Sequence, residues 1–380
     1  MKFVIAPDSF KGSLTAKEAA EDIRTGLARV YPDATYELVP MADGGEGTVQ
    51  SLVDATDGEL ITETVTGPLG KPVQAAYGML GDGETAAIEM SAASGIGFVT
   101  DETKNPLVTT TYGTGELIIK ALDRGAKKII LGIGGSATND GGAGMAQAIG
   151  VSLKDAADQE LGFGGGQLGD LLTIDVSGVD PRIKDTEILI ASDVTNPLVG
   201  ETGASAVFGP QKGATPEMVK TLDDNLNHYA AVIKATMGKD LADYPGAGAA
   251  GGLGAGLLAF TNATMDRGIE IVIAYTKLKE RAQNADYVIT GEGGIDFQTQ
   301  YGKTPYGVAL ATKSVAPNAP VIVMAGNIGE GVDVLYKKEA IDAIFATPDG
   351  AKPLDKAIAD TDHDISELAE NIARLIKASH

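Results

Sequence analysis

Apolar and polar positions follow a strand-and-helix rhythm at the start of the chain. Residues 2–6 form a short apolar run that predicts a strand, and Pro7 ends it. Residues 15–18 (TAKE) have the form of a capping box, and apolar residues then recur at helical spacing at Ala19, Ile23, Leu27 and Val30. Residues 35–40 predict a second strand, and residues 41–56 predict a turn and a second helix. This β-α-β-α order is typical of a parallel sheet covered by helices.

The last hundred residues return to the same rhythm. Strands are predicted at 285–291, 319–326 and 340–347, and helices at 306–316 and 365–379. The last helix carries an apolar stripe of Leu368, Ile372, Leu375 and Ile376. Together the two ends of the chain supply about five strands with helices between them, which is the size of a flavodoxin-like sheet.

The middle of the chain has a different pattern. Residues 59–67, 73–80 and 85–90 predict consecutive short strands separated by turns rather than helices. Such strands favour an antiparallel or mixed sheet. Two helical stretches follow, at residues 114–125 and 217–237.

The chain has 380 residues, which favours two domains over one core. We predict an α/β protein whose flavodoxin-like parallel-sheet domain is discontinuous, with residues 1–57 plus 284–380. A second α/β domain with a mixed sheet, residues 58–283, would be inserted into it. Both predicted crossings lie in polar stretches.

Charge and composition then narrow the possible functions. The chain has 52 acidic residues against 30 Lys and Arg, a net charge of −22, so we expect no nucleic-acid or membrane partner. The absence of Cys excludes disulfides and thiolate chemistry, and only three His disfavour a zinc site or a Ser-His-Asp triad. No signal-peptide pattern and no apolar run of about 18 residues is present, so a cytoplasmic location is expected.

Polar side chains gather after the predicted strands of the discontinuous domain. Ligands of open α/β sheets bind outside the carboxyl ends of the strands. The candidates there are Asp8, Ser9 and Lys11 after the first strand, Asp43 and Glu46 after the second, and Glu292, Asp296 and Lys303 after a later one.

Each of these candidates has a structural alternative. Asp8, Ser9 and Ser13 are typical turn formers and helix caps, whereas Lys11 caps nothing at a helix start. Asp43 and Glu46 also fit a capping box. Capping explains at most one of the two acids Glu292 and Asp296 in the later loop.

The inserted domain has a strand, a Gly-rich turn and a helix at residues 127–150. Backbone N–H groups in such a turn, together with a helix N-terminus, suit a phosphate. The candidates are Gly134, Gly135, Ser136, Thr138 and Asn139. The turn is not a Walker A loop, and the lack of an acid about twenty residues later disfavours a dinucleotide site. The alternative is a tight turn that only packs.

A second dense stretch follows at residues 187–214. A strand leads to Asp193, Asn196 begins a turn, and Lys212 lies in a small Gly-containing loop. A carboxylate at a strand end and a nearby lysine are what metal-bound phosphate needs. The small residues at 245–260 either let a backbone approach a ligand or pack a helix on a sheet.

The sequence therefore favours a Mg²⁺-dependent enzyme that handles phosphate in an interdomain cleft. Phosphoryl transfer needs positioning, a cation and one base, and oxygen ligands suit Mg²⁺. We assign Asp193 and Asp296 as base or metal ligand, without deciding which does which, and Lys11 as a catalytic lysine. Lys11 or Lys212 would contact a phosphate or a carboxylate, with Asp43 and Glu292 as supporting ligands.

Six stretches of this sequence resemble the type I glycerate kinase family of bacteria. They are APDSFKGSLTA, MADGGEGT, GIGGSATNDGGAG, SDVTNPLVGETGASAVFGPQKGA, GAGAAGGLGAG and VITGEGGIDFQTQYGKTPYGVA, and the resemblance runs from residue 1 to about residue 350. It implies ATP-dependent phosphorylation of D-glycerate by a flavodoxin-like domain with an inserted second domain and an active site between them. It also favours 2-phosphoglycerate over 3-phosphoglycerate as the product.

Two other classes of function compete with a kinase. A non-catalytic sensor of a hydroxy acid would show one or two polar contacts in an apolar pocket, unlike the many acids and lysines here. A phosphatase or mutase with an aspartyl nucleophile would show an Asp-x-Asp pair after the first strand, which is absent. The pattern favours no particular oligomeric state.

Overall fold

The computed structural model describes residues 1–337 and 339–379 and divides into two compact units. Unit 1 consists of Met1–Asp43, Gln50–Asp57 and Arg267–His380, and unit 2 of Gly44–Val49 and Gly58–Asp266. Among the described residues, no helix has the length and apolar character that crossing a membrane requires.

Unit 1 is built on a five-stranded sheet in which every strand pair is parallel. The spatial order is β13 (Ala343–Ala346), β12 (Val321–Ile328), β11 (Tyr287–Ile295), β1 (Lys2–Ile5) and β2 (Thr35–Leu38). Counted along the chain this is the order 2-1-3-4-5 of flavodoxin-like sheets. The predicted fold of the outer domain is therefore confirmed.

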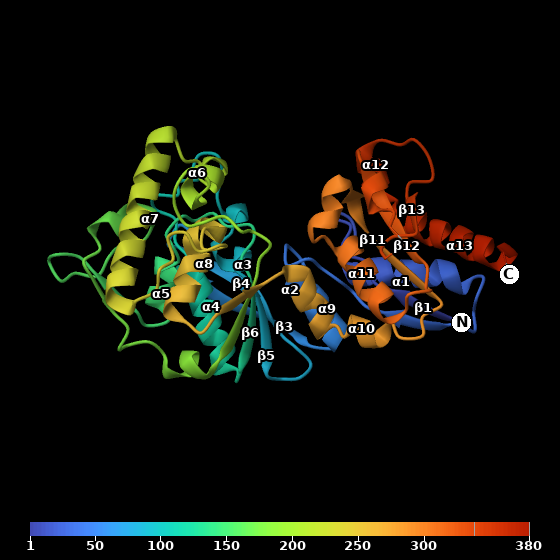
Figure 1. Ribbon diagram of the computed structural model, residues 1–380, viewed down its shortest axis with the longest axis horizontal. Helices are drawn as coiled ribbons and strands as arrows, with labels where there is room; N and C mark the ends of the chain where they lie inside the picture. Colours follow the sequence, from blue (N-terminus) through green and yellow to red (C-terminus); the bar gives the residue numbers. More distant parts are fainter. Residues whose placement is uncertain (338, 380) are drawn as a thin grey trace. The chain divides into compact units, whose positions relative to one another are not determined.

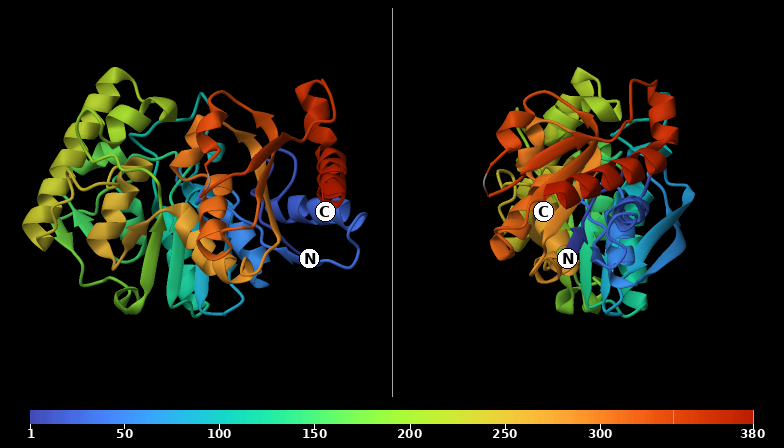
Figure 2. Two further views of the ribbon diagram at one scale, coloured as in Figure 1. Left: turned by 45° about the vertical axis from the view of Figure 1, so that its right-hand side comes forward. Right: turned by 90° about the vertical axis from the view of Figure 1, so that its right-hand side faces the viewer.

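Helices cover the sheet of unit 1 because their apolar faces bury against it (Figure 1). On one face α1 (Ala16–Ala28) packs against the long C-terminal α13 (Thr361–Ser379), as Figure 2 also shows. Their buried residues share one core with the strands, which includes Phe3, Ile23 and Ile372. The other helices and 3-10 turns are α2 (Thr48–Thr56), α9 (Gly268–Tyr275), α10 (Leu278–Arg281), η5 (Phe297–Tyr301), α11 (Thr304–Val315), η6 (Val332–Leu335) and α12 (Leu354–Ala359).

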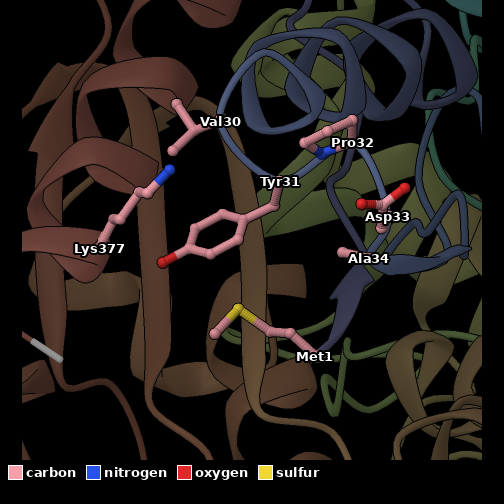
Figure 3. Close-up of a pocket in the computed structure, with 7 residues that line it drawn as sticks. All are labelled: Met1, Val30, Tyr31, Pro32, Asp33, Ala34 and Lys377. Carbon is pink, nitrogen blue, oxygen red and sulfur yellow. The ribbon is translucent and has the colours of Figure 1, made fainter.

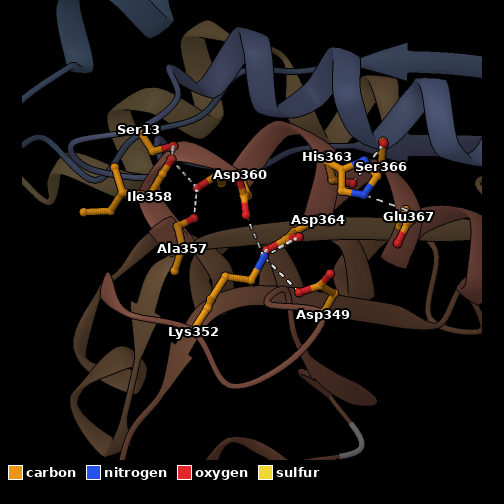
Figure 4. Close-up of polar contacts among 11 residues, drawn as sticks. Ser13, Asp349, Lys352, Ala357, Ile358, Asp360, His363, Asp364, Ser366 and Glu367 are labelled. Atoms are coloured by element: carbon orange, nitrogen blue, oxygen red, sulfur yellow. Dashed lines mark hydrogen bonds and ion pairs between the residues drawn. The ribbon is translucent and has the colours of Figure 1, made fainter. Parts of the chain in front are cut away.

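The start of α1 confirms the predicted capping box. The Thr15 side chain accepts the N–H of Glu18, and the Glu18 carboxylate accepts the N–H of Thr15 at 2.9 Å. Ser13 is therefore not the cap. Its hydroxyl donates instead to the carbonyl of Ile358 at 2.7 Å, which ties the turn after β1 to α12 (Figure 4).

A partly buried lysine holds α12 and α13 in place. Lys352 Nζ lies 2.8 Å from Asp349 and from Asp364, and 3.2 Å from Asp360 (Figure 4). The Asp364 side chain is only 1% exposed, and these carboxylates raise the pKa of Lys352. Because each buried charge has a partner, the cluster stabilises the C-terminal segment rather than awaiting a ligand.

Unit 2 contains a six-stranded mixed sheet, as predicted. Its order is β10 (Thr264–Asp266), β9 (Glu187–Ala191), β6 (Lys128–Gly132), β5 (Thr85–Glu89), β4 (Pro72–Met79) and β3 (Glu59–Thr66). The β3–β4 and β4–β5 pairs are antiparallel, whereas β5, β6, β9 and β10 run parallel. A small antiparallel pair, β7 (Ser152–Lys154) and β8 (Thr173–Asp175), was not predicted.

The helices of unit 2 bury their apolar faces in one large core with this sheet. The two helices expected from the pattern are α4 (Tyr112–Asp123) and α7 (Pro216–Met237). The others are α3 (Ser91–Ser94), η1 (Ile96–Phe98), α5 (Ala143–Ala148), η2 (Gly165–Asp170), η3 (Pro181–Asp185), α6 (Ala204–Phe208), η4 (Pro210–Lys212) and α8 (Ala249–Phe260).

We compare the boundaries of the two units with the predicted domain boundaries, which lie after residue 57 and after residue 283. Unit 2 begins its long segment at Gly58, but it ends at Asp266. The segment after Asp266 belongs to unit 1, because α9 and α10 pack against α11 and Arg281 pairs with Glu37 at 3.2 Å. These contacts are between residues far apart in the sequence, so a local pattern does not reveal them.

Candidate functional site

The candidate site of unit 1 lies at the carboxyl ends of its neighbouring strands β1 and β11. These are the first and third strands of the sheet in chain order, so the strand order reverses between them. Ligands of open parallel sheets bind at such a reversal. The backbone N–H of Asp8 donates to the carbonyl of Gly291 at 2.8 Å, which brings Asp8 next to Glu292. The structure thus brings together two of the acids that the sequence singled out.

The carboxylate of Asp8 is buried and held from two sides. The hydroxyl of Thr304 donates to Oδ2 at 2.5 Å, and the N–H of Ser9 donates to Oδ1 at 2.6 Å. Burial raises the pKa of Asp8 to about 6, the charge of Asp43 also raises it, and the hydrogen bonds from Thr304 and Ser9 oppose the rise. Asp8 is therefore mostly ionised at neutral pH, but its pKa lies only slightly below neutral pH.

Glu292 is a half-buried acid at the end of β11. Its Oε1 atom is buried and has no hydrogen-bond partner among the described residues. Burial raises the pKa of Glu292 to about 8; Lys303 lowers it, and the carboxylates of Asp8, Asp43 and Asp296 raise it. Unpaired buried polar atoms are rare in folded proteins and often mark a place where a ligand belongs.

Asp296 and Lys303 frame the turn that follows β11. Asp296 is the N-cap of η5, and its Oδ1 accepts the N–H of Gln298 at 2.7 Å. Lys303 precedes α11 and its charge favours the ionised form of Glu292. Asp296 is therefore the capping residue, whereas Glu292, which the sequence placed in the loop, lies within β11 and caps nothing.

The other sequence candidates of unit 1 lie in the loops after β1 and β2. Lys11 is exposed, whereas Ser9 and Asp43 are partly buried. The capping box proposed for Asp43 and Glu46 is wrong, because α2 begins only at Thr48.

The acid at the start of α2 is one that the sequence reasoning missed. The carboxylate of Glu89, at the end of β5, accepts the N–H of Val49 at 3.0 Å. Glu89 is separated from Val49 by forty positions, so a four-residue capping pattern does not identify it.

In unit 2 the Gly-rich turn after β6 has an exposed part and a buried part. Gly134 and Gly135 are exposed, whereas Ser136, Thr138 and Asn139 are buried. The amide of Asn139 donates to the hydroxyl of Ser205 at 2.9 Å. Thus only the first part of the turn presents its surface, and the rest is embedded in the core.

Asp140 occupies the helix N-terminus that the sequence reasoning offered to a phosphate. It is fully buried and accepts from the N–H and the hydroxyl of Thr111 at 2.8 and 2.9 Å. It also accepts the N–H groups of Gly142 and Gly144 at 3.2 and 3.3 Å, at the start of α5. Burial raises the pKa of Asp140, and these hydrogen bonds lower it. The chain therefore supplies its own anion at this helix.

Lys212 braces the same turn from the loop after α6. It is 1% exposed, and its Nζ donates to the hydroxyl of Ser136 and to the carbonyl of Thr138, both at 2.6 Å. Burial lowers the pKa of Lys212 to about 7, although the charge of Asp140 acts in the opposite direction. With such a pKa, Lys212 loses its proton near neutral pH, because burial in the core disfavours its charged form.

The small residues of α8 pack against this turn. Ala250, Gly251 and Gly252 have left-handed backbone conformations inside the helix. A Cβ atom on Gly251 would lie 2.0 Å from the carbonyl oxygen of Thr138. Of the two explanations left open for residues 245–260, close packing thus accounts for Gly251.

Asp193 and Asn196 lie in the loop after β9. The strand ends at Ala191, so Asp193 is two residues beyond it rather than at its end, and its side chain is exposed. The amide of Asn196 donates to the carbonyl of Thr202 at 2.8 Å and closes the following turn.

The hollow drawn in Figure 3 lies at the other edge of the sheet of unit 1. It has a volume of about 410 Å³, and it is lined by Met1, Val30, Tyr31, Pro32, Asp33, Ala34 and Lys377. Met1 precedes β1 and Ala34 precedes β2, so the hollow is at the amino ends of the strands. It is therefore not where ligands of such sheets bind.

The described acids fit a magnesium ion only in a limited way. Among residues 1–337 and 339–379, no three His, Asp or Glu side chains are arranged to hold a metal ion. Mg²⁺ commonly keeps several waters and binds through one or two carboxylates plus substrate phosphates. Taken singly, Asp193 of unit 2, which is exposed, and Asp296 of unit 1, which uses Oδ1 as a cap, are each compatible with that second mode.

Three residues of these clusters escaped the sequence reasoning for a shared reason. Thr304, Thr111 and Glu89 are ordinary in their local context, and only contacts with distant segments give them a part. For Thr304 a signal was present, because it follows the Gly-rich loop after β11 and opens a helix.

Comparison with known proteins gives a consistent result along the whole chain. The sequence profile of the "Glycerate kinase family" matches residues 3–377. The glycerate kinase of Bacillus subtilis (strain 168) is 54% identical over 377 residues, which cover 99% of this chain and 98% of the relative. The glycerate 2-kinase of Escherichia coli (strain K12) is 53% identical over 373 residues, 98% of this chain and 97% of the relative.

A solved structure agrees with these relatives. It is a crystal structure from Salmonella typhimurium LT2, provisionally named glycerate kinase 2, and it is 49% identical to this chain. It superposes with a TM-score of 0.92 and covers 100% of this chain and 99% of that one.

Proposed function

Since the chain belongs to the glycerate kinase family, we propose that this phosphotransferase transfers the γ-phosphoryl group of ATP to the C2 hydroxyl of D-glycerate. ATP as co-substrate follows from membership of a kinase family. The product would be 2-phosphoglycerate, and the relative from Escherichia coli, which is named a glycerate 2-kinase, supports this choice.

One observation in the structure supports this function most directly. Buried Asp8 and half-buried Glu292 lie side by side at the reversal point of the unit 1 sheet, and Glu292 Oε1 has no hydrogen-bond partner in the part of the chain that the structure describes. A fold does not keep two neighbouring carboxyl groups partly buried for stability, because like charges raise the free energy of both. A ligand that brings a hydroxyl group or a cation would relieve this situation.

The remaining sequence candidates keep the roles that their chemistry suggests. Lys11 and Lys212 would act on the phosphates of ATP or the carboxylate of glycerate, and the exposed Gly134 and Gly135 would approach a phosphate. Asp193 or Asp296 would hold Mg²⁺ through a carboxylate oxygen, and phosphate oxygens and water would complete its coordination. When bound, that ion would neutralise charge on the transferred phosphoryl group.

The test is to identify the product of the purified full-length protein. The protein is incubated with ATP, MgCl₂ and D-glycerate, and the product is given to enolase with and without phosphoglycerate mutase. We expect phosphoenolpyruvate without mutase, since enolase uses 2-phosphoglycerate directly. Phosphoenolpyruvate only in the presence of mutase would identify 3-phosphoglycerate and overturn the proposed position of transfer.

A second measurement separates a kinase from a sensor. ADP release is followed with and without D-glycerate, and L-glycerate is the control for stereochemistry. A sensor would bind glycerate without releasing ADP. Omitting Mg²⁺ or adding excess EDTA should abolish release, and full activity under those conditions would contradict the proposed metal.

A further inference from the structure

The sequence left two roles open for the same acids: the base that accepts the hydroxyl proton and the ligand of the metal. The structure separates these roles. We propose that Asp8 accepts the proton of the substrate hydroxyl, and that Thr304 is the positioning residue that aims its carboxylate. This inference rests on the proposed kinase function.

The position of Asp8 carries the first step of the argument. Pro7 and Asp8 follow β1 directly, and the N–H of Asp8 is fixed to the carbonyl of Gly291 at 2.8 Å. Asp8 is therefore attached to two neighbouring inner strands of unit 1, β1 and β11, at the reversal point where ligands of such sheets bind. A base on a rigid strand end keeps its geometry during the reaction.

The contacts of the carboxylate carry the second step. Thr304 is fully buried at the first position of α11, and its hydroxyl donates to Oδ2 of Asp8 at 2.5 Å. The N–H of Ser9 holds the other oxygen, Oδ1. The Ser9 hydroxyl also donates to Oδ1, at 3.2 Å. Donors from two different segments thus fix the plane of the carboxylate, and Oδ2, which accepts only the Thr304 hydroxyl among the described residues, retains a lone pair for a proton.

The other acids of the proposed site fit this role less well. Asp296 uses Oδ1 to cap η5, and Asp193 is exposed in an irregular loop. Asp43 is only partly buried. Glu292 is next to Asp8, but its carboxyl group is the one that stays protonated at neutral pH, so it has no capacity to accept another proton.

The charged groups around Asp8 help to raise its pKa toward neutral pH. Asp43, from the loop after β2, raises the pKa of Asp8, while Glu292 of β11 faces it. Glu292 in turn is acted on by Lys303 before α11 and by Asp296 at the end of β11. With burial as the largest cause, the pKa of Asp8 reaches about 6, which suits a general base that works near pH 7.

The step balances without any further reactant. The hydroxyl oxygen of the substrate forms a bond to the γ-phosphorus of ATP, and the bond from that phosphorus to the β–γ bridging oxygen breaks. ADP leaves with the electron pair of the broken bond. The hydroxyl proton passes to the ionised carboxylate of Asp8, from which solvent removes it after the transfer.

The pH dependence of kcat/KM of the full-length enzyme tests the proposal. The wild type should lose activity below an apparent pKa near 6. Thr304→Val removes a hydrogen bond that favours the ionised form, so this acid limb should move to higher pH and kcat should fall about tenfold. Thr304→Ser retains the hydroxyl and should restore the limb. A Thr304→Val limb at the wild-type position would overturn the positioning role.

Asp8→Asn supplies a second test that does not depend on Thr304 variants folding. We expect a fall in kcat of about a hundredfold or more with the KM for glycerate changed less than threefold. Asp22→Asn is the matched control, because burial and neighbouring acids also raise the pKa of Asp22 to about 6, but it lies on α1 beside Asp362. Its kcat should stay within twofold of wild type.

Two results would overturn the role of Asp8. One is an Asp8→Asn enzyme that keeps more than half of the wild-type kcat, and the other is an unchanged acid limb in that variant. A wild-type protein that releases no ADP with D-glycerate would instead refute the proposed function, and the inference with it. The two failures are thus distinguished by the wild-type assay alone.

Discussion

Two buried aspartates follow strands in the two units, and their surroundings are opposite. Asp140 in unit 2 is fully buried and accepts four hydrogen bonds, two from Thr111 and two from the start of α5. Asp8 in unit 1 also accepts hydrogen bonds, from Ser9 and Thr304, but it is beside a second acid, Glu292, one of whose oxygens has no partner among the described residues. Both aspartates have a raised pKa, so the shift alone does not distinguish them.

The difference lies in whether the fold itself satisfies the carboxylate. A buried charge with a full set of donors contributes to the fold and has no capacity left for a ligand. A buried acid next to another acid raises the free energy of the folded state and is retained for a function. We therefore assign Asp140 to the scaffold and Asp8 with Glu292 to the chemistry.

The largest effect should come from removing the scaffold aspartate. Asp140→Ala leaves two N–H groups of α5 and the Thr111 donors without an acceptor, so the free energy of unfolding should fall by about 3 kcal/mol or more. Urea unfolding of the full chain measures this. Asp155→Ala, in a turn where the carboxylate accepts two N–H groups near the surface, should lose less than about 1 kcal/mol.

Urea unfolding of the Asp8→Asn variant tests whether Asp8 differs from Asp140 in its contribution to stability. Its free energy of unfolding should stay within about 1 kcal/mol of wild type, because the amide oxygen of Asn can accept the Ser9 N–H while the Thr304 hydroxyl turns to accept from the Asn amide group. If Asp8→Asn destabilises the protein as much as Asp140→Ala, the distinction between scaffold and site is wrong.

The next largest effect concerns one acid from each unit. Asp193→Asn and Asp296→Asn should each lower kcat about a hundredfold, equivalent to about 2.7 kcal/mol, and weaken the dependence on Mg²⁺. Asn caps helices nearly as well as Asp, so stability should remain. Asp180→Asn is the control, because Asp180 caps η3 through the N–H of Arg182 as Asp296 caps η5.

The metal assignment fails under a defined condition. If both Asn variants retain more than half of the wild-type kcat at saturating Mg²⁺, Asp193 and Asp296 are structural. The control variant Asp180→Asn must keep the wild-type kcat, so that a loss in the other two variants is not a general effect of replacing a capping Asp with Asn.

The two candidate lysines extend the contrast between an exposed and a buried group. Lys11→Met and Lys212→Met should each raise a KM or lower kcat at least tenfold, equivalent to about 1.4 kcal/mol. Lys11 is exposed, so its variant should keep the wild-type Tm, whereas loss of the Lys212 contacts to Ser136 and Thr138 should also change Tm. Lys17→Met, which removes an exposed pair with Asp54, should leave kinetics unchanged. Wild-type kinetics in both variants would remove the lysines from the site.

The smallest effect is a pair of opposite slopes of stability against pH. The pKa of Glu292 is raised from 4.5 to about 8, so the folded protein binds more protons and its stability falls between these pH values. The pKa of Lys212 is lowered from 10.5 to about 7, so the unfolded protein binds more protons and stability rises in that window.

Tm measured against pH checks both signs. Glu292→Gln should flatten the decline between pH 5 and 8, and Lys212→Met should remove the rise between pH 7 and 10, each by a few degrees. Slopes identical to wild type in both variants would show that neither group titrates differently on folding.

The architecture of unit 1 and the mixed sheet of unit 2 follow from the local pattern of apolar and polar residues. Apolar runs at 2–6, 285–291 and 319–326 alternate with helical stripes, and such β-α units form parallel sheets on their own local periodicity. The capping box at Thr15 and the long α7 were predictable for the same reason. The sequence also indicated that acids follow the strands, because those positions are adjacent to the apolar runs.

Which of those acids have their hydrogen-bonding capacity filled depends on contacts between distant segments of the folded chain. Asp8 receives the Thr304 hydroxyl from a segment 296 positions away, and Asp140 receives Thr111 from 29 positions away. Whether Glu292 is buried depends on strands and helices that meet only in the folded chain. Burial and hydrogen-bond partners set the protonation of a carboxyl group, and both arise from residues distant in sequence. The local pattern therefore located the acids, and the fold separated the scaffold from the candidate site.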